Sequence, residues 1–369
     1  MRILFSLTYY SPYISGLTNY LRNLAEELAA RSHQCRVLCM KHDASLPVYE
    51  TINGVGIIRA VPLFKVSKGF LSLDFAVKSV KSVRESERIV IGLPQAEGFL
   101  PAILGKVFRK KVTAIYLCDV VLPQGILNKI ATVILDVCNL VTLSLADKVV
   151  TYGADYADSS RLLPHFRKKL VYIYPPVRKP QRSTGTAKYG RKGKLLIGMA
   201  GRMAEEKGVE YLLEALNAID PRTEVLIAGP TEPAGEQAYK ERVTKAVRRA
   251  GRKVKVAGVI PEGEMGDFYS CLKILALPSV NATEAFGMVQ VEAMMCGVPV
   301  VASDLPGVRL PIRETGMGIT VPPKNPAALA EAINEILNNY DSYRMGKVKA
   351  EEVFDLKKII DRFEKIITG

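Results

Sequence analysis

The chain has 369 residues, of which 48% are apolar and 24% charged, a content that supports a large core and favours two domains over one. Six cysteines without a CxxC pair and three histidines without metal-ligand spacing argue against a metal centre and predict buried, reduced thiols in a cytoplasmic protein. The formal net charge is +14, with 22 − 13 = +9 through Pro176 and 29 − 24 = +5 beyond it, so an anionic partner is expected: phosphates, an acidic membrane face or nucleic acid.

Strand and helix signals alternate along the first half. Apolar runs predict strands at 3–7, 35–40, 89–92, 112–117, 148–151 and 170–173. A helix is expected over 17–30, where leucines recur at helical spacing. The most apolar stretch, 126–150, is interrupted by Lys129, Asp136 and other polar residues. It is therefore predicted to be an amphipathic or buried helix and not a membrane span.

The alternation stops at 174–177, which contains two prolines, and the basic stretch 178–194 that follows is the best candidate for a linker. A second alternating set begins after it. Strands are expected at 195–200, 224–228, 254–257, 274–277 and 298–302. Helices are expected at 209–218, 237–250, 265–271, 326–338 and 356–367.

These patterns predict an α/β protein of two Rossmann-like domains that face a cleft. The expected domains are residues 1–176 and 177–354, with the C-terminal helix 355–369 packing back on the first. Ligands bind at the carboxyl ends of the strands in such sheets, so the cleft is the expected site.

Two cations are predicted at the mouth of the second sheet. Gly201 and Arg202 follow a strand, and Lys207 and Gly208 open the next helix. Both cations are placed to reach a diphosphate and to neutralise charge on a departing nucleotide. The alternative is two solvated surface cations beside two acidic neighbours.

Two carboxylates, Glu284 and Glu292, stand eight positions apart around the start of a helix. A helix N-terminus offers free N–H groups and positive partial charge to a phosphate, whereas carboxylates accept hydrogen bonds from sugar or ribose hydroxyls. The combination fits a nucleotide-sugar better than a bare phosphate. Taken singly, Glu292 has an ordinary explanation as a helix acid and Glu284 as a capping or turn acid.

With these residues the chain resembles the retaining glycosyltransferases of family 4, which have the GT-B double-Rossmann fold. The resemblance covers nearly the whole chain, and the family's E-x7-E motif falls on Glu284 and Glu292. The other segments that carry it are Tyr10-Ser11-Pro12, Gly16 with the following helix, Ala146–Val150, Gly201-Arg202, Lys207-Gly208 and Pro278-Ser279.

The resemblance implies a retaining transfer of a sugar from a nucleotide-diphospho-sugar to a glycan, a lipid-linked or a small acceptor. It implies that Glu284 contacts the donor sugar and Glu292 the ribose, while Arg202 and Lys207 hold the diphosphate. It implies that the backbone N–H groups of four residues form the phosphate cradle: Phe286, Gly287, Met288 and Val289. It also implies that the segment Gly258, Val259 and Ile260 lies against the base.

Two departures from the family pattern concern the first half. Ser15-Gly16 stands where the family often has two glycines, and Gly16 alone is expected to allow a close approach of a phosphate. The usual histidine is absent near Leu117-Cys118, so Asp119 becomes the polar group expected to face the acceptor. A turn cap is the alternative role of Asp119.

No D-x-D triplet occurs, so we expect neither an obligatory metal nor a cofactor besides the donor. The departing diphosphate is expected to take the acceptor proton. Basic residues interleaved with Phe and Leu in 65–84 and 106–111 suit an anionic membrane, which would place the protein at the inner membrane face. A solvated helix face is the alternative for both segments.

Three other classes remain as alternatives. Nucleotide-sugar epimerases share the double-Rossmann plan but not the pattern of the two cations and two carboxylates. A nucleic-acid-binding protein would account for the charge, but aromatic residues make up 7%, tryptophan is absent and no nucleic-acid motif occurs, so no nucleic acid is expected. An NAD(P) oxidoreductase would need G-x-G-x-x-G, whereas Gly16 stands alone.

Overall fold

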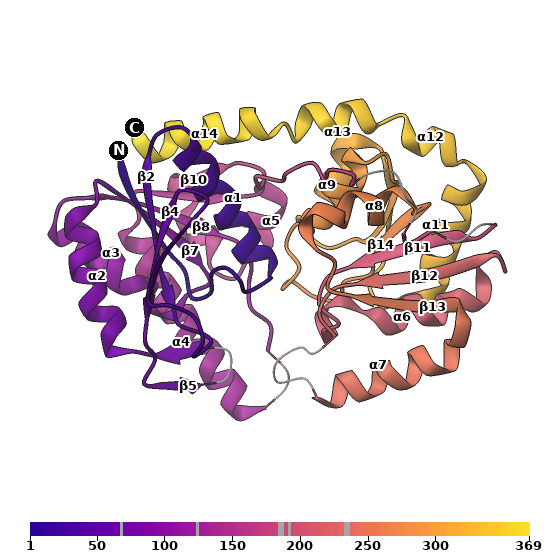
Figure 1. Ribbon diagram of the computed structural model, residues 1–369, viewed down its shortest axis with the longest axis horizontal. Coiled ribbons are helices and arrows are strands. Elements are labelled where there is room, and N and C mark those ends of the chain that lie inside the picture. Colours follow the sequence, from indigo (N-terminus) through magenta and orange to yellow (C-terminus); the bar gives the residue numbers. More distant parts are fainter. Residues whose placement is uncertain (67–68, 123–124, 184–187, 191–192, 232–236) are drawn as a thin grey trace. The chain divides into compact units, whose positions relative to one another are not determined.

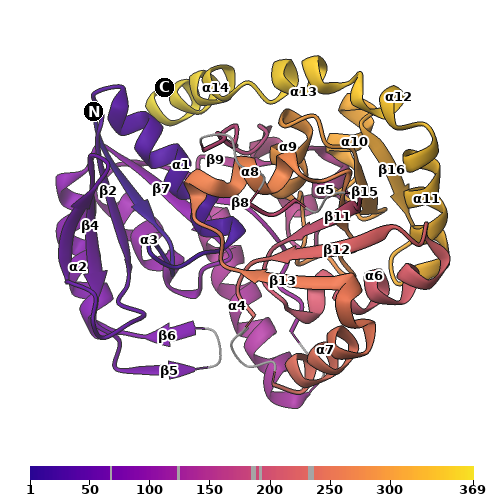
Figure 2. The same ribbon diagram turned by 45° about the vertical axis from the view of Figure 1, so that its right-hand side comes forward.

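The computed structural model describes residues 1–66, 69–122, 125–183, 188–190, 193–231 and 237–369. The chain divides into two compact units (Figure 1): unit 1 is residues 1–176 with 356–369, and unit 2 is residues 177–355. Each unit has a largely parallel sheet between helices (Figure 2). The predicted α/β class with two Rossmann-like domains is confirmed.

Unit 1 is built on an eight-stranded sheet in the order β10-β9-β8-β7-β1-β2-β4-β3, in which β3 is antiparallel to β4 and the other pairings are parallel. Its strands are β1 (Arg2–Ser6), β2 (Gln34–Met40), β3 (Tyr49–Ile52), β4 (Val55–Ala60), β7 (Arg88–Leu93), β8 (Lys111–Tyr116), β9 (Lys148–Thr151) and β10 (Leu170–Tyr172). A separate antiparallel pair consists of β5 (Phe64–Val66) and β6 (Gly69–Leu71).

The helices of unit 1 lie on both faces of this sheet. They are α1 (Gly16–Ala30), α2 (Leu73–Glu85), α3 (Phe99–Val107), α4 (Ile126–Leu145), α5 (Ala154–Ser159) and α14 (Leu356–Thr368), with the 3-10 turns η1 (Ala96–Gly98) and η2 (Leu163–Lys169). From β1 the chain passes through α1 to β2 on one side of β1. The helices α2, α3 and α4 instead lead to β7, β8 and β9, which follow one another on the other side of β1. Because such crossovers are right-handed, α2, α3 and α4 share the face opposite to α1.

The C-terminal helix α14 is part of unit 1. Arg31 at the end of α1 lies 2.5 Å from Asp361 and 2.7 Å from Glu364, and His33 Nε2 lies 2.7 Å from the same Glu364 carboxylate. The hydrogen bonds from His33 and Arg31 lower the pKa of Glu364. Phe363, which is buried, adds an apolar contact to the α1 side.

Unit 2 is built on a six-stranded parallel sheet in the order β13-β12-β11-β14-β15-β16. Its strands are β11 (Leu195–Ala200), β12 (Thr223–Ala228), β13 (Val254–Gly258), β14 (Ile274–Leu277), β15 (Val300–Ser303) and β16 (Gly318–Val321). Its helices are α6 (Val209–Ala215), α7 (Gln237–Ala250), α8 (Met265–Ser270), α9 (Met288–Met295), α10 (Leu310–Thr315), α11 (Pro326–Asn338), α12 (Tyr340–Arg344) and α13 (Lys347–Val353), with the 3-10 turns η3 (Glu205–Lys207), η4 (Leu216–Ala218), η5 (Gly251–Lys253) and η6 (Glu262–Glu264).

The central strands of unit 2 are mostly apolar because helices cover both faces of the sheet. All six residues of β12 are buried, and one core joins the sheet to α6, α7 and α11, with Ile197, Leu212 and Ile333 fully buried within it. This core holds in place the carboxyl ends of the strands β11, β12, β13 and β14. The candidate site is built from the loops that follow these ends.

The structure decides between the two predictions for residues 126–150. They form α4 and, after a short connection, β9. Only 17% of the most apolar 18-residue window of α4 is buried, so of the two predicted alternatives α4 is the amphipathic helix and not the buried one. By length and composition alone, α4 could cross a membrane. The sequence patterns also missed the β3–β4 edge, α2, α3 and β16. Parts of two predicted segments, residues 184–187 and 191–192 of the linker and 67–68 of the basic segment 65–84, lie outside the described residues.

Candidate active site

The loops after β11 and β14 emerge side by side from the sheet of unit 2. These strands are hydrogen-bonded neighbours although β12 and β13 separate them in the sequence. The order of strands reverses between β11 and β14, and this reversal is the topological switch point at which open α/β sheets bind ligands. The residues predicted to bind the diphosphate and the sugars all follow one of these two strands: Arg202, Lys207, Glu284 and Glu292.

An ion pair joins the two loops. Lys207 ends η3, after β11, and its ammonium contacts a carboxylate oxygen of Glu284. Ser279, just after β14, donates its hydroxyl to the same oxygen at 3.3 Å. The Lys207 and Glu284 side chains are only 17% and 12% exposed. Both charges are largely withdrawn from water, so each depends on the other for compensation.

A second ion pair holds Arg202 next to this one. Arg202 Nη2 lies 2.7 Å from Glu206 Oε1, with side chains 26% and 10% exposed. The Val280 N–H donates to the Glu206 carbonyl at 3.0 Å, which ties η3 to the loop after β14. The alternative of two solvated surface cations therefore does not describe Arg202 and Lys207. Glu206 is a buried anchor of this loop that the sequence patterns did not reveal.

Two glycines allow backbone segments to approach closely beneath these pairs. Gly229 follows β12 with φ +134°, and a Cβ added to it would lie 2.0 Å from the Gly201 carbonyl oxygen. Gly208 has φ +62°, and its added Cβ would lie 2.2 Å from the Pro278 carbonyl oxygen. Neither position accepts a side chain without movement of a neighbouring loop.

Glu292 lies in α9 and is held by a tyrosine from α8. The Tyr269 hydroxyl donates to Glu292 Oε2 at 2.6 Å. Burial, and then the charge of Glu292, raise the pKa of Tyr269 well above its usual value, so this hydroxyl stays a donor at neutral pH. Sequence reasoning missed Tyr269 because helices α8 and α9 meet only through the tertiary fold.

The predicted phosphate cradle, residues 286–289, spans the start of α9. Gly287 precedes the helix with φ +75°, and Met288 and Val289 begin it. Phe286 is buried, and its carbonyl accepts a hydrogen bond from the Gln290 amide at 2.5 Å. Because the first N–H groups of a helix have no acceptor within it, those of Met288 and Val289 are oriented along the axis at this end.

The segment predicted to lie against the base, residues 258–260, begins at the last residue of β13, at the same edge of the sheet. The Gly258 carbonyl accepts a hydrogen bond from the Gly229 N–H at 2.7 Å. Ile260 is 8% exposed, whereas Val259 is 54% exposed. Val259 therefore presents an apolar surface two strands away from the Gly201 loop.

Gly16 belongs to unit 1, where it is the first residue of α1. Ser15 caps the helix by accepting a hydrogen bond from the Thr18 N–H at 3.1 Å. No atom lies within 4 Å of a Cβ added to Gly16. The local structure therefore does not require glycine at this position, and its proximity to a phosphate remains a prediction.

Asp119 is buried, which corrects the expectation that it faces the acceptor. It is 3% exposed, and its carboxylate accepts hydrogen bonds from the Tyr116 hydroxyl at 2.7 Å, the Ser160 hydroxyl at 3.2 Å and the Arg161 N–H at 3.3 Å. Burial, and then the Asp119 charge, raise the pKa of Tyr116. The carboxylate links the end of β8 to the segment after α5.

Glu97 is a buried carboxylate that sequence reasoning did not select. It lies in η1 after β7, beside β1, where the strand order of unit 1 reverses. It is 8% exposed, and burial raises its pKa. No motif marks this residue in the sequence. In the described part of the chain, no group of three or more His, Cys, Asp or Glu side chains is placed to hold a metal ion.

The fold of each unit is that of known GT-B glycosyltransferases. The structure of HepE from Anabaena in complex with UDP-glucose superimposes with a TM-score of 0.80 at 19% identity, over 100% of this chain and 99% of that one. WaaG, a glycosyltransferase of lipopolysaccharide biosynthesis, superimposes with a TM-score of 0.72 at 16% identity, over 100% of each chain. The GT-B fold expected from the sequence is confirmed.

Residues 182–353, most of unit 2, match the model of the family described as glycosyl transferases group 1. The chain is 29% identical over 238 residues to D-inositol 3-phosphate glycosyltransferase 1 of Catenulispora acidiphila, which covers 60% of this chain and 56% of that protein. It is 27% identical over 346 residues to the phosphatidyl-myo-inositol mannosyltransferase of Mycobacterium leprae, covering 88% and 84%. The matched part spans about half the length of the first curated relatives, 56% and 45%.

Proposed function

We propose that this protein transfers a glycosyl group from a nucleotide-diphospho-sugar to an acceptor hydroxyl, with retention of configuration and without a metal ion. The observation that carries the proposal is the Lys207–Glu284 pair at the switch point of unit 2, with Arg202 beside it. A cation and a carboxylate in contact are complementary to the two parts of such a donor. The diphosphate needs positive charge, and the sugar needs hydrogen-bond acceptors.

When the donor binds, Lys207 and Glu284 give up their contact with each other and each contacts a group of the donor. Lys207 turns from Glu284 to the diphosphate, and Glu284 accepts hydrogen bonds from hydroxyls of the sugar. Glu292, positioned by Tyr269, accepts from the ribose. Val259 lies against the base, and the N–H groups that begin α9 complete the contacts with the phosphates.

Charge development explains how these groups would accelerate the reaction. Cleavage of the bond between the sugar and the phosphate builds negative charge on the diphosphate and positive charge on the sugar. Arg202, Lys207 and the N-terminus of α9 stabilise the leaving group more strongly as its charge grows, which lowers the barrier. The leaving phosphate takes the acceptor proton. A bell-shaped pH profile that is abolished by substitution of a carboxylate other than Glu284 would argue against this last step.

The acceptor side is proposed to include a peripheral membrane contact through residues 65–84 and 106–111, on the cytoplasmic face. Two observations support an acceptor at a membrane. These segments are basic, and a full-length relative carries a phosphatidylinositol acceptor in its name. The acceptor itself is a glycan, a lipid-linked compound or a small molecule.

The test is thermal stabilisation of the purified protein by a panel of nucleotides and nucleotide-sugars, including UDP and UDP-glucose, without added metal. A ligand at a hundredfold excess over its Kd adds about 2.7 kcal/mol. We expect one diphospho-sugar to raise Tm, and Arg202→Ala and Glu292→Ala to abolish the rise. Arg222→Ala is the matched control, because Arg222 pairs with Asp220 on an exposed surface of the same unit.

A Tm that responds to no nucleotide, while the protein is folded, would overturn the proposal. Equal losses in Arg202→Ala and Arg222→Ala would show that general charge and not the site binds the ligand. Formation of an isomerised free sugar nucleotide without an acceptor would instead favour an epimerase.

A further inference from the structure

Many of the large exposed apolar residues of the protein lie on helices of unit 1. On α4 they occupy seven positions: Ile126, Leu127, Ile130, Val133, Ile134, Val137 and Val141. At 3.6 residues per turn these positions fall within an arc of about 120°, so they form one stripe along a helix about 30 Å long. The individual exposures run from 38% at Val141 to 82% at Leu127. The apolar side of this amphipathic helix thus faces outward.

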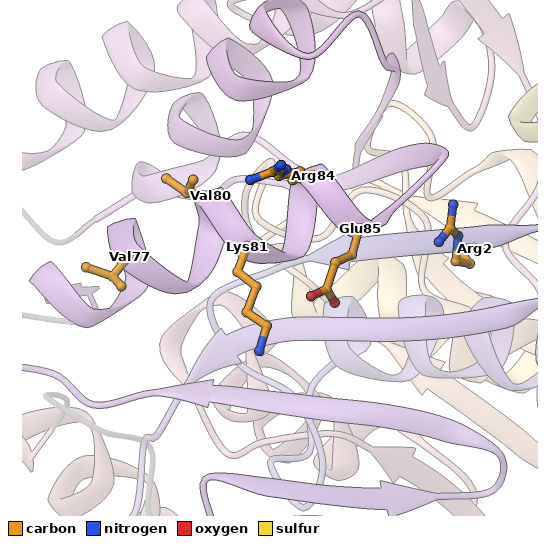
Figure 3. A pocket seen from close by; sticks show the side chains of 6 residues that line it. All are labelled: Arg2, Val77, Val80, Lys81, Arg84 and Glu85. Carbon is orange, nitrogen blue, oxygen red and sulfur yellow. The ribbon is translucent and has the colours of Figure 1, made fainter.

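The neighbouring helices extend the same surface. α2, α3 and α4 lie on one face of the sheet, and α2 and α3 each expose apolar side chains next to basic ones. Val77 on α2 is 70% exposed and Val107 on α3 is 66% exposed. A hollow of about 730 Å³ on α2 has the same mixed character (Figure 3), being lined by Arg2, Val77, Val80, Lys81, Arg84 and Glu85.

The charge of this surface is positive. Exposed cations on or beside the three helices include Lys81, Arg84, Arg109 and Lys129. The carboxylates of these helices each have a basic partner: Asp74 pairs with Lys78 at 2.6 Å, Glu85 with Arg36 at 2.5 Å and Asp136 with Arg161 at 3.1 Å. An apolar stripe flanked by cations is complementary to lipid chains beneath anionic headgroups.

We propose that α4 is the membrane-docking element of this protein: it lies in the interface plane of an anionic bilayer with its apolar stripe inserted, and α2 and α3 contact headgroups beside it. This deepens the membrane contact included in the proposed function and does not depend on which sugar is transferred. It also moves the centre of that contact from the basic segments to α4.

A spanning orientation is incompatible with the packing of α4. Its inner side carries buried Asn139, whose side chain accepts a hydrogen bond from the Gln95 N–H at 3.2 Å, and buried Leu143. The helix also connects β8 to β9, which pair in parallel. Extraction of α4 across a bilayer would expose these groups and break the sheet, whereas insertion of the outer stripe leaves both intact.

A second copy of the chain is a poorer occupant than a membrane. A two-fold contact through this surface would bring its cations toward the same cations of the partner, which is repulsive. Anionic headgroups instead neutralise them. The two occupants also differ in their salt dependence, since attraction to anionic lipid weakens as the Debye length shortens.

The absence of tryptophan from the sequence gives a direct test. Val137→Trp, at a position 53% exposed in the stripe, introduces a single fluorophore, and Val348→Trp, at a position 74% exposed on α13 of unit 2, is the matched control. Full-length protein is mixed with vesicles of phosphatidylcholine alone or with added phosphatidylglycerol. We expect a blue shift and quenching by bromolipids for Val137→Trp with the anionic vesicles only, and no change for Val348→Trp.

Cosedimentation with the same vesicles measures the contribution of the stripe. The double variant V133S/V137S is expected to reduce partitioning by roughly tenfold to a hundredfold, because two apolar side chains are lost from the inserted face. Val348→Ser serves as its control. Both variants change exposed residues, so unchanged Tm values verify that they are folded.

Three results would overturn the proposal. These are an unshifted Val137→Trp spectrum with anionic vesicles, cosedimentation of V133S/V137S equal to that of the parent, and a lipid-free dimer that this double variant dissociates while vesicle binding is absent. The last result would assign the surface to a second copy. In each case nucleotide-dependent stabilisation of unit 2 still tests glycosyl transfer separately.

Discussion

Substitution of Gly229 by alanine tests whether the candidate site depends on the close approach of two loops. The residue has φ +134°, a region open essentially to glycine alone, and adoption of it by alanine costs about 1–3 kcal/mol. The new Cβ would lie 2.0 Å from the oxygen and 2.6 Å from the carbon of the Gly201 carbonyl. These are backbone atoms that cannot rotate aside, so the Gly201 loop must move, at a further cost of about 1–3 kcal/mol.

We therefore expect Gly229→Ala to destabilise unit 2 by about 4 kcal/mol. For a unit of this size that lowers Tm by roughly 8–16 °C, which differential scanning calorimetry resolves. Displacement of Gly201 also shifts Arg202, so affinity for the nucleotide-sugar should fall at temperatures where the variant is still folded. Gly125→Ala is the matched control, since Gly125 has φ +148° but no atom within 4 Å of its added Cβ.

The comparison separates backbone strain from the clash. The Gly125→Ala control is expected to show only the cost of backbone strain, because its added Cβ meets no neighbouring atom. Equal decreases of Tm in Gly229→Ala and Gly125→Ala would refute the reasoning about the close approach. A large decrease of Tm with unchanged nucleotide affinity would show that the loop after β11 is not part of the donor site.

Four further predictions concern the site, the proposed independence of a metal ion, and α14. Lys207→Ala leaves the Glu284 carboxylate largely buried beside one hydroxyl, so we expect a loss of about 1–3 kcal/mol in thermal unfolding, most of it recovered in the double variant K207A/E284Q. Tyr269→Phe removes the 2.6 Å hydrogen bond to Glu292 and should weaken nucleotide binding about tenfold in calorimetric titration, whereas an unchanged Kd would exclude Tyr269 as a positioning residue. Activity should persist in EDTA after dialysis, and its loss with recovery on addition of Mg²⁺ would contradict metal independence. Because the pKa of Glu364 is lowered in the folded protein, its carboxylate stabilises the docking of α14 above the unfolded pKa of about 4.3, and this contribution is lost as pH falls through the folded value. Amide exchange in α14 should therefore accelerate in acid, less steeply in Glu364→Gln.

Sequence patterns alone were enough to predict the fold class, because in each unit helices cover both faces of the sheet. Fully covered strands read as continuous apolar runs, and helices beside them read as 3.6-residue periods, so both signals are local. The edge strand β3 (YETI) lacks such a run: its residues alternate between exposed and half-buried, and the pattern missed it. Glu284 and Glu292 were likewise selected by their spacing within one segment of sequence.

The pairing of site residues was decided by tertiary structure. Lys207 and Glu284 are 77 positions apart and meet because β11 and β14 become neighbours, an order of strands that no local pattern encodes. The Tyr269 contact with Glu292 depends in the same way on the packing of α8 against α9. Asp119 shows the converse, since the fold surrounds it with donors and withdraws it from solvent.

The stripe on α4 shows the limit of periodicity as a guide to burial. A helical apolar period establishes that one side of a helix is apolar, and the usual inference is that a core covers this side. Whether anything covers it depends on where neighbouring helices and strands lie. In α4 the polar Asn139 faces the protein while Val133 and Val137 face outward, so the sequence determined the amphipathic pattern and the tertiary structure alone determined which side met the core.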